Sequence, residues 1–508
     1  MSELLNAPED GITVRMYRQG HGDCFLLAMP RKGGGDPVHL LIDCGYKPGS
    51  QKTLPANNIG QIVKHIETAT NKSLDVVVVT HEHQDHVNGF WKKTKPYFKD
   101  ITIDEAWLAW TESPSDALAK KLRKKHRDQL LQLVEARNQM AGFAAKGDDD
   151  EAVKNLDEFL ALEFGGEDYQ FNLKGMRSML GATDIRKSTN KQAMKLIMDK
   201  ADQNRGVSYL NPGDSLMIPG TEVRAYIFGP PRSEDLLKDE DPKGDEEFHF
   251  QREFAGQFSF GAALNAGKGN VASPFRKSYA ETSGRALQQT FFKDHYGKGG
   301  DGKDRRDQIE SPDNAGWRRI DHDWMRSAEN LALKLNTGIN NTSLVIAFEL
   351  PRSGKVLLFV GDAQRGNWLS WNDRDFTVEG EKVTAKDLMG RTVLYKVGHH
   401  CSHNATLDGN PDSDYPNLSW MGKGSFGEEF TAMITAVEKW ALTKNNPPWR
   451  HPLPAIRKAL DAKSQGRIFQ TDIDMPEKPE GVSDATWAAF LNSSVFEKLY
   501  FDFTVRDQ

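Results

Sequence analysis

The sequence THEHQDHVNG at positions 80–89 places three histidines and an aspartate within the six residues from His81 to His86. It follows LDVVVV at 74–79, a β-branched run typical of a buried strand. These side chains therefore lie where a strand ends and the chain turns over the edge of a sheet. Imidazole nitrogens and carboxylate oxygens suit Zn²⁺ and, less selectively, Mn²⁺ or Fe²⁺. The stretch predicts a metal site; the alternative is a polar loop that is rich in histidine by chance.

The spacing of these donors indicates two neighbouring ion sites. His81 and His83 lie two residues apart, so their side chains point the same way in an extended chain. Asp85 and His86 follow on the turn, where they can face a second ion. We expect residues 90–91 to begin a helix after this turn.

The composition limits the class of protein. The chain has 508 residues, of which 38% are hydrophobic and 27% charged, so one large domain with insertions or two domains are both open. The net charge of −6 provides no overall attraction to nucleic acid or anionic membranes. Residues 1–11 lack the features of a signal peptide, and no stretch is apolar for long enough to span a bilayer. We therefore expect a cytoplasmic protein without membrane contact and with reduced thiols at Cys24, Cys44 and Cys401.

Alternating and β-branched segments predict a sheet-rich fold with two insertions. A helix is expected at 59–68, and strands are expected at 12–17, 24–29, 38–42, 74–79, 101–110, 215–218, 223–228, 344–350, 355–360, 393–397, 430–437 and 467–472. This order favours an α+β sandwich. The expected divisions are a first half at 1–111, a helical insertion at 112–205, a return to the sandwich at 206–230, a polar insertion at 231–337 that forms a lid or an oligomer contact, a second half at 338–475, and a C-terminal extension at 476–508.

Four predicted strands end in residues that can bind metal. These ends carry Asp43, the cluster at 81–86, Asp362, and the pair His399 and His400. Because α/β sheets place their chemistry at the carboxyl ends of strands, we expect these residues to converge.

With this set of residues the chain resembles the metallo-β-lactamase superfamily, whose His-x-His-x-Asp-His signature is complete at 81–86. It is most similar to the hydrolase domain of ComEC-type competence proteins. The same succession of motifs occurs at 20–23 (GHGD), 42–45 (IDCG), 341–345 (NTSLV), 358–363 (LFVGDA), 396–400 (KVGHH) and 471–472 (TD). The resemblance covers residues 11–110, 206–230 and 338–475, and it implies the αβ/βα sandwich of that superfamily with two insertions.

The resemblance also implies roles for individual residues and a pair of divalent ions, zinc with manganese as the alternative. The first ion would be bound by His81 and His83. The second would be bound by Asp85, His86 and His399, with Asp362 bridging the two ions. His400 is the alternative ligand at the end of that strand, or it contacts substrate as a catalytic residue. Asp43 would orient a ligating histidine.

The chain departs from the family pattern in two places. The usual histidine between the first cluster and the Gly-Asp motif has no clear counterpart, because the remaining candidates lie outside the resemblance and are expected at the surface: His126, His249, His295 and His322. Cys401 stands where glycine is usual; it is a soft extra ligand or, as we favour, a packed thiol. Two interpretations are open for His21 and His451. Either residue contacts substrate, or His21 is only part of a turn and His451 only precedes a helix.

Hydrolysis by a metal-bound hydroxide follows from the two-ion site, with Asp85 holding the proton of the water. The first hypothesis is a phosphodiesterase, and specifically a nuclease with nucleic acid as partner. It rests on the resemblance and on the basic run KKLRKKHR at 120–127, although such a run is more often a solvated helix face. The alternatives are a hydrolase of a small ester, lactone, lactam or phosphorylcholine-type substrate, and a non-catalytic protein whose metal site is structural.

Overall fold

The computed structural model confirms a mixed α/β protein, consistent with the α+β class. It describes residues 4–55, 58–92, 95–96, 98–144, 150–165, 188–248, 288, 290, 332, 335, 338–444 and 449–508. The chain divides into two compact units, the first formed by residues 1–127, 158–251 and 334–508 and the second by 128–157 and 252–333. All the strands described below belong to the first unit.

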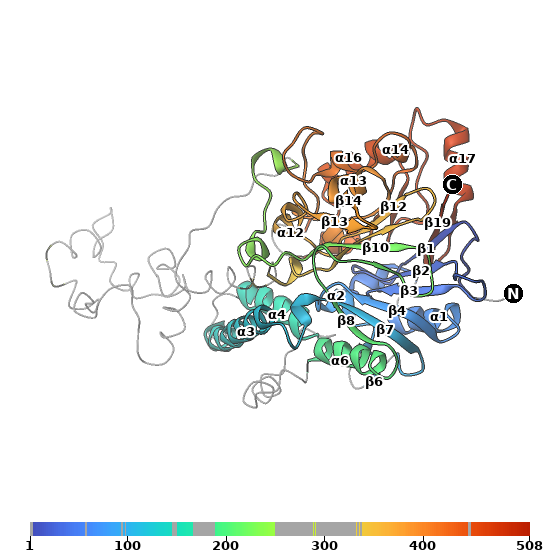
Figure 1. The fold of residues 1–508 in the computed structure, drawn as a ribbon. Coiled ribbons are helices and arrows are strands. Elements are labelled where there is room, and N and C mark those ends of the chain that lie inside the picture. Colours follow the sequence, from blue (N-terminus) through green and yellow to red (C-terminus); the bar gives the residue numbers. More distant parts are fainter. Residues whose placement is uncertain are drawn as a thin grey trace. The chain divides into compact units, whose positions relative to one another are not determined.

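The first unit contains two large mixed sheets (Figure 1). In the eight-stranded sheet the order is β18 (Ser494–Phe496), β19 (Tyr500–Arg506), β1 (Gly11–Tyr17), β2 (Phe25–Met29), β3 (Val38–Ile42), β4 (Ser73–Val79), β7 (Thr102–Ala109) and β8 (Gly206–Leu210). The strands from β18 to β3 are antiparallel, and those from β3 to β8 are parallel.

The seven-stranded sheet has the same mixed character. Its order is β17 (Ile468–Gln470), β16 (Thr431–Ile434), β15 (Thr392–Lys396), β12 (Val356–Phe359), β11 (Val345–Glu349), β10 (Arg224–Gly229) and β9 (Ser215–Met217). The strands from β17 to β12 are parallel, and those from β12 to β9 are antiparallel. Two small hairpins join β5 (Trp91–Lys92) to β6 (Lys95–Pro96) and β13 (Asp375–Val378) to β14 (Glu381–Thr384).

The two large sheets pack face to face. One apolar core is built from both of them, with Val14 and Val78 of the first sheet and Ile227, Phe348 and Phe359 of the second. The outer face of the first sheet is covered by α1 (Ile59–Ala69) and α6 (Thr189–Ala201). The outer face of the second is covered by α12 (Arg365–Leu369), α13 (Ala385–Gly390) and α16 (Pro454–Ser464) (Figure 1).

Local sequence accounts for the covering helices. The N-cap of α1 is Asn58, whose side chain accepts a hydrogen bond from the backbone of Gly60. Ile59, Ile62, Val63 and Ile66 then recur at helical spacing and are buried against the sheet. The other α-helices that lie wholly in described parts of the first unit are α2 (Gln84–Val87), α14 (Ser425–Glu429), α15 (Glu438–Ala441) and α17 (Asp484–Asn492).

In the second unit, the described residues of the segment 128–157 belong to α3 (Ala117–Ala144) and α4 (Asp150–Phe164), which both continue into the first unit. The Arg137 guanidinium pairs with the Asp157 carboxylate, at 2.6 Å between Nη2 and Oδ2. Leu133 and Leu156 are buried. No helix in the described ranges combines the length and the apolar character that crossing a membrane requires.

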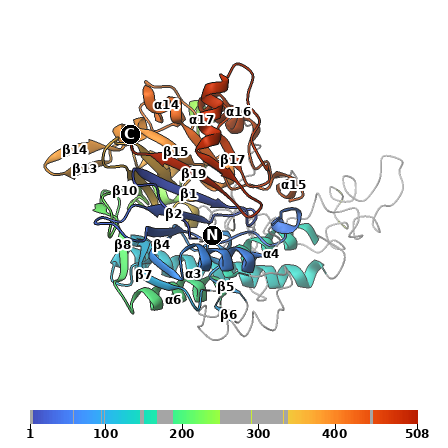
Figure 2. The same ribbon diagram turned by 90° about the vertical axis from the view of Figure 1, so that its right-hand side faces the viewer.

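Several elements differ from the sequence-based expectations. The helix expected to begin at 90–91 is wrong: α2 lies inside the histidine motif, and Trp91 starts β5. The segment 476–508, expected to be an extension, contributes β19, which lies beside β1 along its whole length (Figure 2). The helix α6, assigned to the first insertion, packs on the first sheet. Most of the 231–337 insertion lies outside the described residues.

Candidate metal centre

The ends of parallel strands bring the predicted metal-binding residues together. Asp43 follows β3 and the 81–86 cluster follows β4, its parallel neighbour. Asp362 and the pair at 399–400 follow β12 and β15, which are also parallel neighbours. The face-to-face sheets place these two edges side by side, and the backbone N–H of Leu344 donates to the carbonyl of Thr80 at 2.9 Å.

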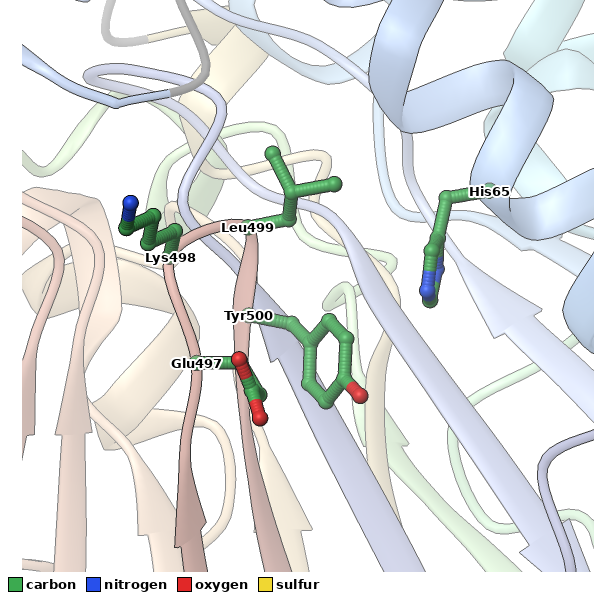
Figure 3. A pocket seen from close by; sticks show the side chains of 5 residues that line it. All are labelled: His65, Glu497, Lys498, Leu499 and Tyr500. Carbon is green, nitrogen blue, oxygen red and sulfur yellow. The ribbon is translucent and has the colours of Figure 1, made fainter. Parts of the chain in front are cut away.

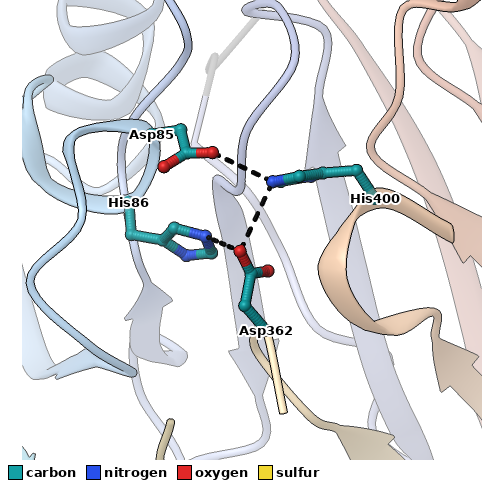
Figure 4. Close-up of side chains that lie close together, drawn as sticks. All are labelled: Asp85, His86, Asp362 and His400. Atoms are coloured by element: carbon teal, nitrogen blue, oxygen red, sulfur yellow. Dashed lines mark hydrogen bonds and ion pairs between the residues drawn. The ribbon is translucent and has the colours of Figure 1, made fainter. Parts of the chain in front are cut away.

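Four buried side chains form a compact group, the second-site group, consisting of Asp85, His86, Asp362 and His400 (Figure 4). Their ligand atoms lie within 4.8 Å of one another. His400 Nε2 is 3.0 Å from Asp85 Oδ2 and 3.6 Å from Asp362 Oδ2, and His86 Nε2 is 3.2 Å from the same Asp362 oxygen. Ligands of a tetrahedral zinc ion are about 3.3 Å apart, so these spacings fit such an ion.

Hydrogen-bond partners orient the two histidines in this group. His86 Nδ1 donates to Asp43 Oδ2 at 2.7 Å. His400 Nδ1 lies 3.1 Å from Thr435 Oγ1, whose proton is already donated to Asp23 Oδ1 at 2.6 Å, so His400 Nδ1 is the donor. Both histidines therefore use Nδ1 to donate to an oxygen outside the group and turn Nε2 toward its carboxylates, the arrangement found in metal-binding histidines.

A first-site group is formed by His81 and His83, whose facing atoms are His81 Nε2 and His83 Nδ1, 3.1 Å apart. Thr80 Oγ1 donates to Asp43 at 2.6 Å and can accept from His81 Nδ1 at 3.1 Å, while Ser343 Oγ also lies 3.3 Å from that nitrogen. Glu163 accepts from His83 Nε2 at 3.2 Å, which leaves His83 Nδ1 as a lone pair. A cation between the two facing nitrogens would take the place of the proton that they otherwise share. Asp362 Oδ2 is 3.9 Å from His81 Nε2 and can serve both groups.

Unpartnered buried atoms provide an independent test of whether a metal fits. Asp85 Oδ1, His86 Nε2 and Asp362 Oδ1 are buried and form no hydrogen bond that meets the usual geometric criteria. Leaving such atoms without a partner is costly. A divalent cation satisfies lone pairs of this kind, so the residues present fit a metal.

The charges of the second-site group favour its ionised carboxylates. Burial opposes ionisation of Asp85, but Lys47, with Nζ 3.5 Å from Asp85 Oδ2, helps to hold the pKa of Asp85 well below its ordinary value. Burial likewise opposes ionisation of Asp362, and His86 and His400 hold its pKa well below its ordinary value. Burial disfavours protonated His86, while Asp362 and neighbouring carboxylates raise its pKa. Ionised carboxylates are the form that binds a cation.

The structure distinguishes His400 from His399. Their segment, Gly398–Cys401, is left-handed at His399 (φ 41°), His400 (φ 53°) and Cys401 (φ 63°), a conformation that L-residues rarely adopt. This turn directs His400 into the second-site group. His399 Nε2 lies 4.0 Å from Asp362 Oδ2, and the side chain is 13% exposed. The geometry therefore favours His400, and not His399, as the second-site ligand.

Close backbone contacts hold the metal loop in place. The backbone N–H of Asp23 donates to the carbonyl of Asp85 at 3.0 Å. A Cβ on Gly45 would lie 2.4 Å from the carbonyl carbon of Asp85, so only glycine fits there. The GHGD and IDCG motifs thus support the loop as well as supply Asp23 and Asp43.

Two side chains beside the candidate metal centre come from the first insertion, where sequence reasoning did not find them. Glu163, near the end of α4, accepts from His83 and, through Oε2, from His126 Nε2 at 3.1 Å. His126 was expected at the surface, but its side chain is only 19% exposed. His249, His295 and His322 lie outside the described residues. No motif in the sequence marks Glu163, because its partner stands eighty positions earlier.

The other predicted residues lie around the metal centre. Cys401 is buried in the core of the second sheet, and burial raises the pKa of its thiol to about 12, as expected of a packed thiol. Cys24 and Cys44 are also buried and free, so all three thiols are unpaired. The rings of His21 and His451 stack with centroids 5.4 Å apart.

The basic run at 120–127 lies on α3. Arg123 donates to the backbone carbonyls of Thr111 and Ser113, and His126 reaches Glu163. The exposed members are Lys120, Lys121, Lys124, Lys125 and Arg127. The helix thus presents a basic face, while its inner side contacts the carboxylate that holds His83.

A separate pocket of about 350 Å³ is lined by five residues: His65, Glu497, Lys498, Leu499 and Tyr500 (Figure 3). None of them belongs to the two metal-binding groups, so this pocket is not part of the metal centre.

No family model matches the chain, and no curated protein is similar to it at a significant level. The assignment of its chemistry therefore rests on its own residues and their geometry.

Proposed function

We propose that this protein is a metal-dependent hydrolase of the metallo-β-lactamase superfamily that acts on phosphodiesters. One observation carries the proposal. Asp85, His86, Asp362 and His400 are buried with their ligand atoms within 4.8 Å of one another, and Asp85 Oδ1, His86 Nε2 and Asp362 Oδ1 have no hydrogen-bond partner there. A divalent cation among these residues would satisfy all three atoms.

The arrangement of the chain supports the superfamily. Two mixed sheets pack face to face with helices outside, and the metal-binding residues follow β4, β12 and β15. The order of motifs along the chain is the one that the resemblance implies.

Two divalent cations, zinc or alternatively manganese, fit the two groups. His81 and His83 would hold one cation, Asp85, His86 and His400 the other, and Asp362 both. When bound, such ions activate water and neutralise negative charge on the group under attack. The free Oδ1 of Asp85 can accept the proton of that water, and Lys47 keeps Asp85 ionised.

A phosphodiester substrate is supported by positive charge near the centre. Lys47 lies beside Asp85. The basic face of α3 begins next to His126, which shares Glu163 with the first-site group. Phosphates of a polynucleotide backbone would be attracted to such a face, which favours a nuclease.

The test is hydrolysis by protein loaded with Zn²⁺ or Mn²⁺. Substrates are single- and double-stranded DNA, RNA, bis-p-nitrophenyl phosphate and p-nitrophenyl acetate, with chelated protein and Asp362→Ala as controls. We expect cleavage of phosphodiesters that depends on both metal and Asp362. Turnover of bis-p-nitrophenyl phosphate without polynucleotide cleavage would restrict the function to small phosphodiesters. Hydrolysis of p-nitrophenyl acetate alone would overturn the assignment as a phosphodiesterase. If no substrate is hydrolysed, the assignment as an enzyme is overturned as well.

A further inference from the structure

A cluster of four side chains adjoins the second-site group without belonging to it. It consists of His21, Lys47, Trp449 and His451, and we call it the rim cluster. The ring of His21 contacts that of His400, with centroids 4.4 Å apart. Lys47 Nζ lies 3.5 Å from Asp85 Oδ2. The cluster thus meets the second-site group at two of its ligands.

Hydrogen bonds assign the tautomers of both rim histidines. The backbone N–H of Val437 donates to His21 Nδ1 at 3.2 Å, and a backbone amide can only donate. The proton of His21 is therefore on Nε2, which lies 3.3 Å from His451 Nδ1. His451 Nδ1 must accept, so the proton of His451 is on Nε2. A backbone amide thus determines, through His21, that His451 presents an N–H donor.

Trp449 contacts both Lys47 and His451. The indole ring stacks on the His451 ring with centroids 5.6 Å apart and an interplanar angle of 22°. Lys47 Nζ lies 4.7 Å from the centroid of the same indole ring. The backbone of Lys47 is held as well, because its N–H donates to the carbonyl of His21 at 2.7 Å. Both donors are therefore held in place beside the metal centre.

The rim cluster is also where solvent reaches this part of the centre. Asp85 and His400 are buried, whereas Lys47, Trp449 and His451 are only partly buried. The Lys47 side chain is 12% exposed. A substrate group that approaches Asp85 and His400 from this side meets a lysine ammonium and an imidazole N–H first.

We propose that Lys47 Nζ and His451 Nε2 form a subsite for a phosphoryl oxygen of the substrate, with His21 as the residue that positions His451. The inference deepens the proposed phosphodiesterase function and rests on it. A cation and a neutral N–H donor bind an anionic oxygen together, and neither donor is needed to hold metal. A neutral ester offers no such oxygen before it is attacked, so the subsite discriminates between the two substrate classes.

The first test measures binding of inorganic phosphate by calorimetry to zinc-loaded protein without free zinc. We expect phosphate binding to weaken roughly tenfold or more in each of two variants, Lys47→Met and His451→Phe. The phenylalanine keeps an aromatic ring that can stack on Trp449. His451→Gln, whose amide can still donate, should lose less than His451→Phe. Lys498→Met and His65→Phe, in the separate pocket, are matched controls and should bind like the wild type. Equal binding by all variants would show an adventitious ion only and would overturn the subsite.

The second test separates the subsite from the catalytic proposal. If phosphodiesters are hydrolysed, His451→Phe should raise KM for bis-p-nitrophenyl phosphate with a smaller effect on kcat. If no hydrolysis occurs, the proposed function fails, but weakened phosphate binding in the variants still supports the subsite. If hydrolysis occurs and phosphate binding is unchanged in the variants, the subsite fails and the function stands.

The third test addresses His21. Proton–nitrogen correlation spectra of the imidazoles should show His451 as the Nε2–H tautomer. The signal of His451 is identified as the one that is missing from the spectrum of His451→Gln. In His21→Phe this tautomer should lose its dominance, and phosphate binding should weaken while the zinc content stays unchanged. An Nδ1–H tautomer of His451 in the wild type would contradict the positioning role.

Discussion

The carboxylate of Glu163 accepts a hydrogen bond from His83 Nε2 at 3.2 Å and, with its other oxygen, one from His126 Nε2 at 3.1 Å. Glu163 lies on α4 and His126 on α3, both in the sequence between β7 and β8. The helical insertion therefore determines which nitrogen of His83 faces His81. Burial opposes ionisation of Glu163, but His126 and His83 hold its pKa below the ordinary value.

The first prediction concerns this carboxylate. Glu163→Ala should weaken binding of the first metal ion by roughly 10- to 100-fold, because His83 loses the partner that orients its ring. The second ion should be retained. Competitive titration of zinc with a chromophoric chelator measures both affinities.

Glu163→Gln is the matched variant, since its amide oxygen can still accept from His83. It should retain more first-site affinity than Glu163→Ala. Equal losses in the two variants, or loss of both ions in Glu163→Ala, would show that Glu163 acts only by holding the insertion in place.

The second prediction compares the two groups. Asp85→Ala and Asp362→Ala should abolish metal-dependent hydrolysis, because Asp85 belongs to the second-site group and Asp362 lies within 4 Å of ligand atoms from both groups. His81→Ala should reduce first-site occupancy more than second-site occupancy. Metal content per chain after dialysis, measured by mass spectrometry, tests the asymmetry; equal loss of both ions in His81→Ala would contradict it.

The third prediction concerns stability below the metal centre. Lys396 is buried and pairs with the buried carboxylate of Asp23, and it donates to the carbonyl of Gly361 at 2.9 Å. Lys396→Met should lower the free energy of unfolding by about 3–5 kcal/mol, because Asp23 remains as a buried charge without its cation. Urea denaturation in the presence of a chelator measures this cost without a contribution from metal.

The exposed Lys498 provides the control for that experiment. Lys498→Met should change the free energy of unfolding by no more than about 0.5 kcal/mol. A loss below about 1 kcal/mol in Lys396→Met would mean that the Asp23 carboxylate is satisfied without the lysine.

The fourth prediction concerns pH and lies in the separate pocket. Burial, with a smaller effect of Arg15, lowers the pKa of His65 to about 4 from an ordinary value of 6.5. Between these two values the unfolded chain binds the proton and the folded chain does not. This contribution to stability is therefore complete above pH 6.5 and is lost as the pH falls toward 4.

His65→Phe removes that titration. The free energy of unfolding should then depend less steeply on pH in this window, by less than about 1.4 kcal/mol per pH unit, since His65 is partly exposed and solvent screens it. Urea denaturation at a series of pH values measures the slope. Identical slopes in wild type and variant would contradict the lowered pKa.

Local patterns in the sequence were sufficient for most of the strands. The apolar runs that became β3, β4, β12 and β15 were predicted within one or two residues, since burial on both faces demands continuous β-branched and aliphatic residues. The polar residues directly after these strands were recognisable for the same reason. The helix expected at 90–91 was wrong because the histidine motif itself forms the turn of helix α2.

Contacts between distant segments could not be predicted in this way. The pairing of β1 with β19 joins the two ends of the chain, and no local period signals it. That His400 and not His399 lies in the second-site group depends on three consecutive left-handed residues, which the sequence GHHC does not indicate.

The sequence by itself determined the candidate donors: the types and spacing of His81, His83, Asp85, His86 and Asp362 are those of metal ligands and need no partner to be recognised. Only the tertiary structure decided which nitrogen of each histidine faces the candidate metal centre, because that depends on acceptors such as Asp43, Thr435 and Glu163. The physical reason is the separation along the chain of the residues that interact. Strand and motif patterns are local, whereas an imidazole tautomer is set by an oxygen that folding brings from elsewhere in the chain.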